Sequence, residues 1–296
     1  FMFIVGVSIP LSYDNRKKRG DTELEIRIHA FRRAFLLLLF GWFYYCIGPE
    51  KIVFEFRNVL AQLSFTYLIS FLLLKRSITF QITAGFICIL ISDLLYRFFP
   101  MVGFDQAFVA GENFGAWFNI FISGFENAGH WAAFNAVPTT AHTLWGVVAG
   151  KWLMDKTNQL EKLKRLLIVA SLALLLGYVT TFFTPVIKRI STASFVLLSS
   201  GWTFLALAFF YWLIDIKNIL KKTLIFRVVG MNPIFIYLFA SLGGGDLFLK
   251  IIRPFSNSLI KSFSPWLADF ISGIVVLFGL WYICYWLYKK QIFIKI

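Results

Sequence analysis

The chain has 296 residues, of which 59% are hydrophobic and 19% aromatic, and its formal net charge is +14. A soluble domain has roughly half apolar residues, so this composition excludes a soluble globular protein and indicates a polytopic membrane protein. The 29 Lys and Arg residues are scattered between apolar runs, where orientation in a bilayer explains them, so no nucleic-acid partner is expected. The three cysteines occur singly, and neither a disulfide framework nor a metal site is expected.

Apolar runs of near-spanning length predict an all-α fold, a polytopic transmembrane helix bundle with about nine segments. The runs cover residues 1–13, 30–48, 58–74, 78–95, 136–154, 166–184, 193–214, 224–242 and 266–288. The first run supplies about 13 apolar residues where a span needs roughly 20. We therefore expect the first segment to be truncated, with a further helix and loop upstream of Phe1.

The connections that carry most of the Lys and Arg residues fall on one side if the segments alternate across the bilayer. Because cytoplasmic loops are enriched in Lys and Arg, that side is predicted to be cytoplasmic, and it includes the C-terminus. The longest connection, residues 98–135, falls on the outer side. A short interfacial helix is predicted within it at residues 114–125, where aromatic residues accompany apolar ones. A second is predicted at residues 245–263, in the outer connection before the last segment, where basic residues alternate with apolar ones.

Chemically capable side chains concentrate between Gly129 and Lys151, a stretch that holds two of the three histidines. Pro138 suits the first turn of a helix that begins near it. His142, about one turn into that helix, is either a functional ionisable residue or a neutral imidazole hydrogen-bonded between helices. His130 lies in the outer loop, four residues after Glu126. It either binds a polar ligand and acts as an acid or base, or is a solvated residue of an anchoring loop.

Three further patterns have structural interpretations. Asp93 is followed four residues later by Arg97, and pairing of the two charges is favoured over a proton-relay role. Gly146 and Gly150 form a G-x-x-x-G pattern that permits close approach of another helix. The third histidine, His29, lies in a basic stretch and is expected to be solvated.

Five stretches, taken in chain order, carry a family resemblance. FMFIVGVSIPLS resembles P-x-F-x-F-I-x-G-x-S-I-x-L-S, RNVLAQLSFTY resembles GVLQRLGVTY, and TPVIKRISTASFV resembles TPINKxLWTxSFV. VVGMNPIFIYL resembles xxGMNxIxxYV, and the closing LYKKQIFIKI resembles LYRKKIFWKI. The helix that ends near Lys151 corresponds to a GxLAGK segment. Together they resemble the transmembrane acyltransferases related to heparan-alpha-glucosaminide N-acetyltransferase, including bacterial homologues, over nearly the whole chain.

The resemblance implies one transmembrane acyltransferase domain over residues 1–296, in a bacterial inner membrane. Its implied activity is transfer of an acetyl group from cytoplasmic acetyl-CoA, a co-substrate, to a sugar amine or hydroxyl on the periplasmic side. Arg33 and Lys151 match basic residues of the family and are the expected acetyl-CoA contacts. Lys188 matches the outer TPxxK turn with Pro185 and Ser194, and Asn232 matches the GMN motif. The expected acceptor-binding residues are Glu126, Trp131, Asn135, Lys188 and Asn232.

Two departures from the family pattern shape the assignment. The proposed catalytic histidine of the family precedes its second helix, so the principal catalytic His is expected upstream of Phe1, with His130 and His142 binding or orienting the acceptor. Gln62 stands where the pattern has Arg, and GHWAAFNAVPTTAHT replaces a DPEGxLxTxxS type of sequence, which predicts a different acceptor. The expected partners are membrane lipid and a saccharide acceptor. The oligomeric state is left open, with a homodimer as one possibility. A sugar permease or exporter is the alternative function, since short broken segments also build transport sites.

Overall fold

The computed structural model describes residues 1–47, 52–127, 129–219 and 223–294. Regular structure in these ranges is entirely helical, which confirms the predicted all-α class. The chain divides into two compact units, Phe1–Ile216 (unit 1) and Lys217–Ile296 (unit 2), and each is described by itself. Within the described ranges, six helices are long and apolar enough to span a membrane, as an integral membrane protein requires.

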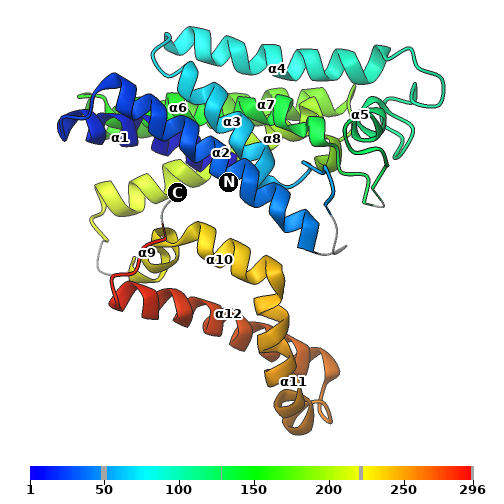
Figure 1. Ribbon diagram of the computed structural model, residues 1–296. Helices are drawn as coiled ribbons and strands as arrows, with labels where there is room; N and C mark the ends of the chain where they lie inside the picture. Colours follow the sequence, from blue (N-terminus) through cyan, green and yellow to red (C-terminus); the bar gives the residue numbers. More distant parts are fainter. Residues whose placement is uncertain (48–51, 128, 220–222, 295–296) are drawn as a thin grey trace. The chain divides into compact units, whose positions relative to one another are not determined.

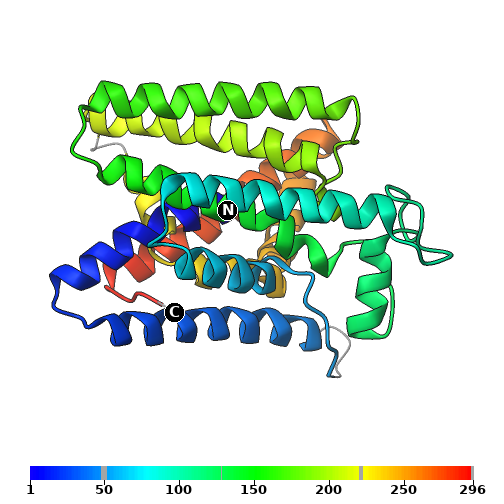
Figure 2. The ribbon, with the colours of Figure 1, turned by 90° about the horizontal axis from the view of Figure 1, so that it is seen from above.

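Unit 1 is a helical bundle in which α7 and α8 lie side by side along one edge and α2 lies along the opposite edge (Figure 2). Side-chain caps fix several helix starts, because Asn58, Ser77, Asn113 and Asn158 each accept a backbone N–H of the first turn. The long helices are α1 (Met2–Lys18), α2 (Glu23–Ile47), α3 (Val59–Leu72), α4 (Ile78–Phe98), α5 (Phe114–Ser123), α6 (Ala136–Met154), α7 (Gln159–Thr181) and α8 (Ala193–Tyr211). The short ones are η1 (Ala133–Asn135), η2 (Lys188–Ile190) and η3 (Trp212–Ile216).

Helix α6 forms the core of unit 1. Every residue from Pro138 to Gly150 is buried, because α1, α3, α4 and α8 pack around it. As predicted, Pro138 lies in the first turn. Side chains added at Gly146 and Gly150 would collide with the backbone carbonyls of α1, so the G-x-x-x-G pattern does permit a close helix contact.

The predicted pairing of Asp93 with Arg97 is confirmed. Arg97 Nε lies 2.7 Å from Asp93 Oδ2. The same guanidinium donates to the carbonyl of Phe183 at 2.8 Å and to Thr184 Oγ1 at 2.6 Å. The ion pair therefore also fixes the end of α4 to the turn that follows α7.

Unit 2 contains a hairpin of α11 on α12, drawn in orange and red in Figure 1. Ser256 Oγ and Ser272 Oγ are 2.6 Å apart across the two helices. The helix that precedes the hairpin is interrupted at Gly243, whose φ of 98° only glycine adopts readily. The elements are α9 (Leu224–Met231), α10 (Pro233–Phe239), η5 (Ala240–Gly244), α11 (Gly245–Ile260) and α12 (Pro265–Lys289).

The predicted count of nine spanning segments is not confirmed. Helices α1 and α3 have 17 and 14 residues, fewer than the roughly 20 that a span needs. The expected segment at 224–242 is divided at Asn232 because Pro233 begins a new helix, and that helix continues through η5 and α11 to Ile260. Helix α5, with 10 residues, occupies the first stretch where a short interfacial helix was predicted. The second stretch, 245–263, holds α11, which belongs to the long candidate span Pro233–Ile260, so a separate short helix is not confirmed there.

Candidate functional site

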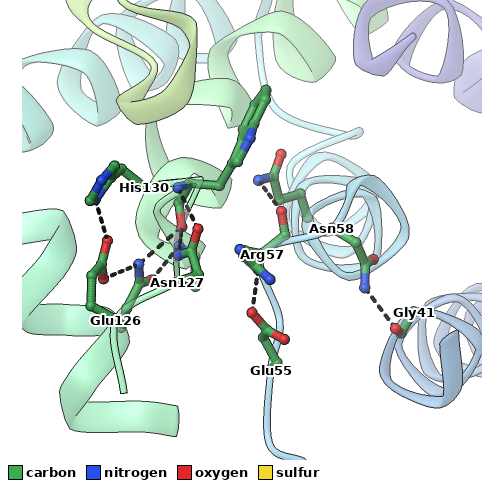
Figure 3. Close-up of polar contacts among 11 residues, drawn as sticks. Gly41, Glu55, Arg57, Asn58, Glu126, Asn127 and His130 are labelled. Atoms are coloured by element: carbon green, nitrogen blue, oxygen red, sulfur yellow. Dashed lines mark hydrogen bonds and ion pairs between the residues drawn. The ribbon is translucent and has the colours of Figure 1, made fainter. Parts of the chain in front are cut away.

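One end of unit 1, here called the histidine end, places the imidazole of His130 against the carboxylate of Glu126. His130 Nδ1 lies 3.3 Å from Glu126 Oε1, and the two side chains are 37% and 20% exposed (Figure 3). His130 has a φ of 51°, in the left-handed region that residues other than glycine seldom adopt. Strained conformations of this kind cluster at functional sites. The turn thus presents a solvent-accessible imidazole that a carboxylate orients.

Two buried asparagines hold this turn in place. Asn119 of α5 donates to Glu126 Oε2 and to the carbonyl of Trp131, both at 2.9 Å, and its Oδ1 accepts the backbone N–H of Ala133 at 2.9 Å. Asn127 donates to the same Trp131 carbonyl at 2.8 Å and accepts the Trp131 N–H at 3.0 Å. Sequence analysis missed both residues. The available signal for Asn119 was a lone amide in the otherwise apolar run FGAWFNIFIS.

Lys188 joins the histidine end from a distant part of the chain. Its Nζ lies 5.5 Å from the ring centroid of Trp131, a cation–π distance. Asn135 Nδ2 donates to the carbonyl of Arg189 at 2.6 Å, which holds η2 against the start of α6. Asn135 is 1% exposed, and its Oδ1 has no hydrogen-bond partner within the described ranges. The structure therefore brings together four of the five residues predicted to bind the acceptor, namely Glu126, Trp131, Asn135 and Lys188.

A second pair of charges lies at the histidine end. Glu55 and Arg57 form an ion pair, and the Arg57 guanidinium lies 5.1 Å from the ring centroid of Tyr45. In Figure 3, Arg57 lies between the His130 turn and the start of α3. No local pattern in the sequence indicates this pair, because the segment before α3 has no regular periodicity and Glu55 is nevertheless buried.

His142 is part of the packing between α6 and α8. Its Nε2 lies 2.7 Å from Ser199 Oγ. Ser199 Oγ donates to the carbonyl of Phe195 at 2.6 Å, so its oxygen is left to accept the imidazole N–H. Of the two interpretations made from the sequence, this geometry matches the hydrogen bond between helices. His142 is seven positions after Asn135, which is about 10 Å along the helix axis.

The other end of unit 1, here called the lysine end, has a groove of about 410 Å³. Lys151 Nζ lines it and donates to the carbonyl of Arg76 at 2.9 Å. Lys75 Nζ lies 2.8 Å from Glu23 Oε2, and this hydrogen bond raises the pKa of Lys75 above its ordinary value. The full lining is Pro10, Tyr13, Asp14, Leu74, Lys75, Ile78, Lys151, Trp152, Met154 and Asp155.

Arg33 and Asn232 lie elsewhere. The Arg33 guanidinium lies 4.9 Å from the ring centroid of Tyr67, and Arg33 does not line the groove that contains Lys151. Asn232, in unit 2, is fully buried. It donates to the carbonyl of Ile292 at 3.0 Å and accepts the N–H of Ile294 at 2.8 Å. The amide of Asn232 is therefore engaged by the backbone of the C-terminal segment.

The TPxxK turn is closed by hydroxyl groups. Thr192 Oγ1 and Ser194 Oγ donate to the carbonyl of Pro185 at 2.7 Å and 2.9 Å.

Within the described ranges, no three His, Cys, Asp or Glu side chains are grouped as a metal site would need. In comparisons with known proteins, no protein-family model and no curated protein matches the chain.

Proposed function

We propose that the chain is a membrane acyltransferase. In this proposal an acetyl group passes from acetyl-CoA at the lysine end to an amine or hydroxyl of a saccharide at the histidine end. The lysine end faces the cytoplasm of a bacterial cell, together with the C-terminus, because Lys and Arg are enriched in cytoplasmic loops. The observation that carries the proposal is the accessible contact between His130 and Glu126.

The chemistry assigned to this pair is general base catalysis. With Nδ1 held by the Glu126 carboxylate, Nε2 of a neutral His130 accepts the proton of the acceptor amine or hydroxyl. The acceptor then attacks the acyl carbonyl, the bond to the donor breaks, and the leaving group takes up the proton. Trp131 adds an apolar face and Lys188 a positive charge beside the pair.

At the lysine end, acetyl-CoA is proposed to bind next to positively charged side chains. CoA is a polyanion, and the groove there contains two ammonium groups, that of Lys75, which pairs with Glu23, and that of Lys151, whose described hydrogen bond is to a backbone carbonyl. His142 lies between the two ends, nine residues before Lys151, which is about 13 Å along the helix axis. Its hydrogen bond to Ser199 keeps the imidazole in one position within α6, where it orients the acceptor side of the site.

The test is transfer of radiolabel from acetyl-CoA to a mixture of amino sugars, with the purified chain in liposomes. His130→Ala should lower the transfer rate by about 10²-fold or more, as loss of a positioned base does. Glu126→Gln should have a smaller effect, and His29→Ala, at the third histidine, is the matched control. An unchanged transfer rate in both His130→Ala and Glu126→Gln would refute the assignment of this pair as the general base. Unchanged transfer in His142→Ala would limit that residue to packing.

A sugar permease is the second candidate, and the break at Gly243 favours it. Transporters commonly bind substrates where a spanning helix is interrupted, and the helix from Pro233 to Ile260 is interrupted at that glycine. The same liposomes separate the two functions. Sugar uptake without any labelled sugar would support the permease and count against the acyltransferase.

A further inference from the structure

A cavity of about 260 Å³ opens among four helices of unit 1. Its lining contains only apolar and aromatic side chains. The indole N–H of Trp145 does not add a free polar group, because Nε1 donates to the carbonyl of Ile82 at 3.3 Å. The lining residues are Ile82 and Phe86 from α4, Trp145, Val148 and Trp152 from α6, Val169, Leu172, Ala173 and Leu176 from α7, and Leu197 and Phe204 from α8.

The cavity is open toward the side of the bundle. Phe86, Leu172 and Leu176 belong to its lining, yet they are 42%, 52% and 47% exposed. These residues lie on α4 and α7, two helices that are long and apolar enough to span a membrane. A ligand therefore reaches the cavity from between the two helices, out of the hydrocarbon of the bilayer. An alkyl chain is the kind of ligand that such walls accept.

The cavity adjoins the groove at the lysine end, because Trp152 lines both. Most charges in the groove are paired. Lys75 pairs with Glu23, and the two groove carboxylates pair with residues outside it, Asp14 with Lys18 and Asp155 with Arg165. Lys151 donates only to a backbone carbonyl among its described contacts. The uncompensated charge next to the apolar cavity is therefore one ammonium group.

We propose that the cavity and the groove together bind one anionic phospholipid from the leaflet at the lysine end. One acyl chain enters the cavity from the side, and the phosphate of the headgroup lies on Lys151. Basic pockets between membrane helices bind such headgroups. The lateral opening favours a bilayer lipid over an acyl-CoA that arrives from water. Because Lys151 is also the residue assigned to CoA, the lipid and CoA compete for it.

The test uses the full chain in nanodiscs of phosphatidylcholine, with a photoactivatable group on one acyl chain of added phosphatidylglycerol. The label should map to residues that line the cavity. Ala173→Phe fills the cavity and should lower labelling by about tenfold, which corresponds to about 1.4 kcal/mol of lost binding free energy. Ser171→Phe is the matched control, because it adds the same ring to an exposed position on the same helix. Lys151→Gln should lower labelling by phosphatidylglycerol but not by a phosphatidylcholine probe.

Equal labelling of Ala173→Phe and Ser171→Phe would overturn the proposal, as would a phosphatidylcholine probe that labels the wild type equally well. Labelling by a long-chain acyl-CoA probe but not by phosphatidylglycerol would overturn the assignment to a phospholipid. If Ala173→Phe does not fold, Ala173→Val provides a smaller filling with the same expected direction. Labelling is measured without acceptor or acetyl-CoA, so failure of the acyltransferase proposal leaves this test intact.

Discussion

Replacement of Asn119 by alanine should loosen the turn that carries His130. The side chain makes three hydrogen bonds, to Glu126, to the Trp131 carbonyl and from the Ala133 N–H. Bonds of this kind contribute about 0.5–1.5 kcal/mol each, and more when one partner is charged. The Trp131 carbonyl keeps its bond from Asn127, and alanine is the better helix former. We therefore expect the free energy of unfolding to fall by about 2–4 kcal/mol.

The assay is unfolding of the purified chain in mixed micelles with increasing dodecyl sulfate, which yields the free energy of unfolding for each variant. Asn15→Ala, at an exposed position near the end of α1, is the control and should stay within about 0.5 kcal/mol of the wild type. Hydrogen exchange at the Ala133 N–H should accelerate only in Asn119→Ala. A loss below about 1 kcal/mol, or unchanged exchange at Ala133, would refute the role assigned to Asn119.

Three further predictions follow from individual contacts. Gly146→Ala should lower the yield of folded protein because its methyl would meet the α1 backbone, whereas Gly273→Ala, which meets open space, should raise thermal stability slightly. The pKa of Lys75 is raised above its ordinary value of 10.5, so its contact with Glu23 stabilises the fold fully at pH values below 10.5. That stabilisation is lost as the pH rises past the raised pKa. Lys75→Met should therefore melt earlier than the wild type near about pH 8, and equal melting there would contradict the pairing. Asn232→Ala should expose the backbone at 292–294 to hydrogen exchange, and protection equal to the wild type would show that the amide does not hold that segment.

The histidine end shows why part of the site was predictable. Glu126 and His130 are four residues apart, and Trp131 is adjacent to the histidine, so local spacing already placed them together. The contributions of Asn119 and Arg57 depend on how a helix and a loop fold back on this turn. Contacts of that kind leave no periodic trace in the sequence.

The sequence by itself determined the helical class, the pairing of Asp93 with Arg97, and the helix that begins near Pro138. Each follows from hydrophobic composition or from spacing along one helix, which are local properties. Only the tertiary structure decided which described helices are long enough to span a membrane, because the length of a helix depends on breaks such as the one before Pro233. It also decided that Lys188 reaches Trp131 and that Trp152 lines both the groove and the apolar cavity. Those arrangements arise from packing between helices far apart in the chain, where no local pattern specifies the partner.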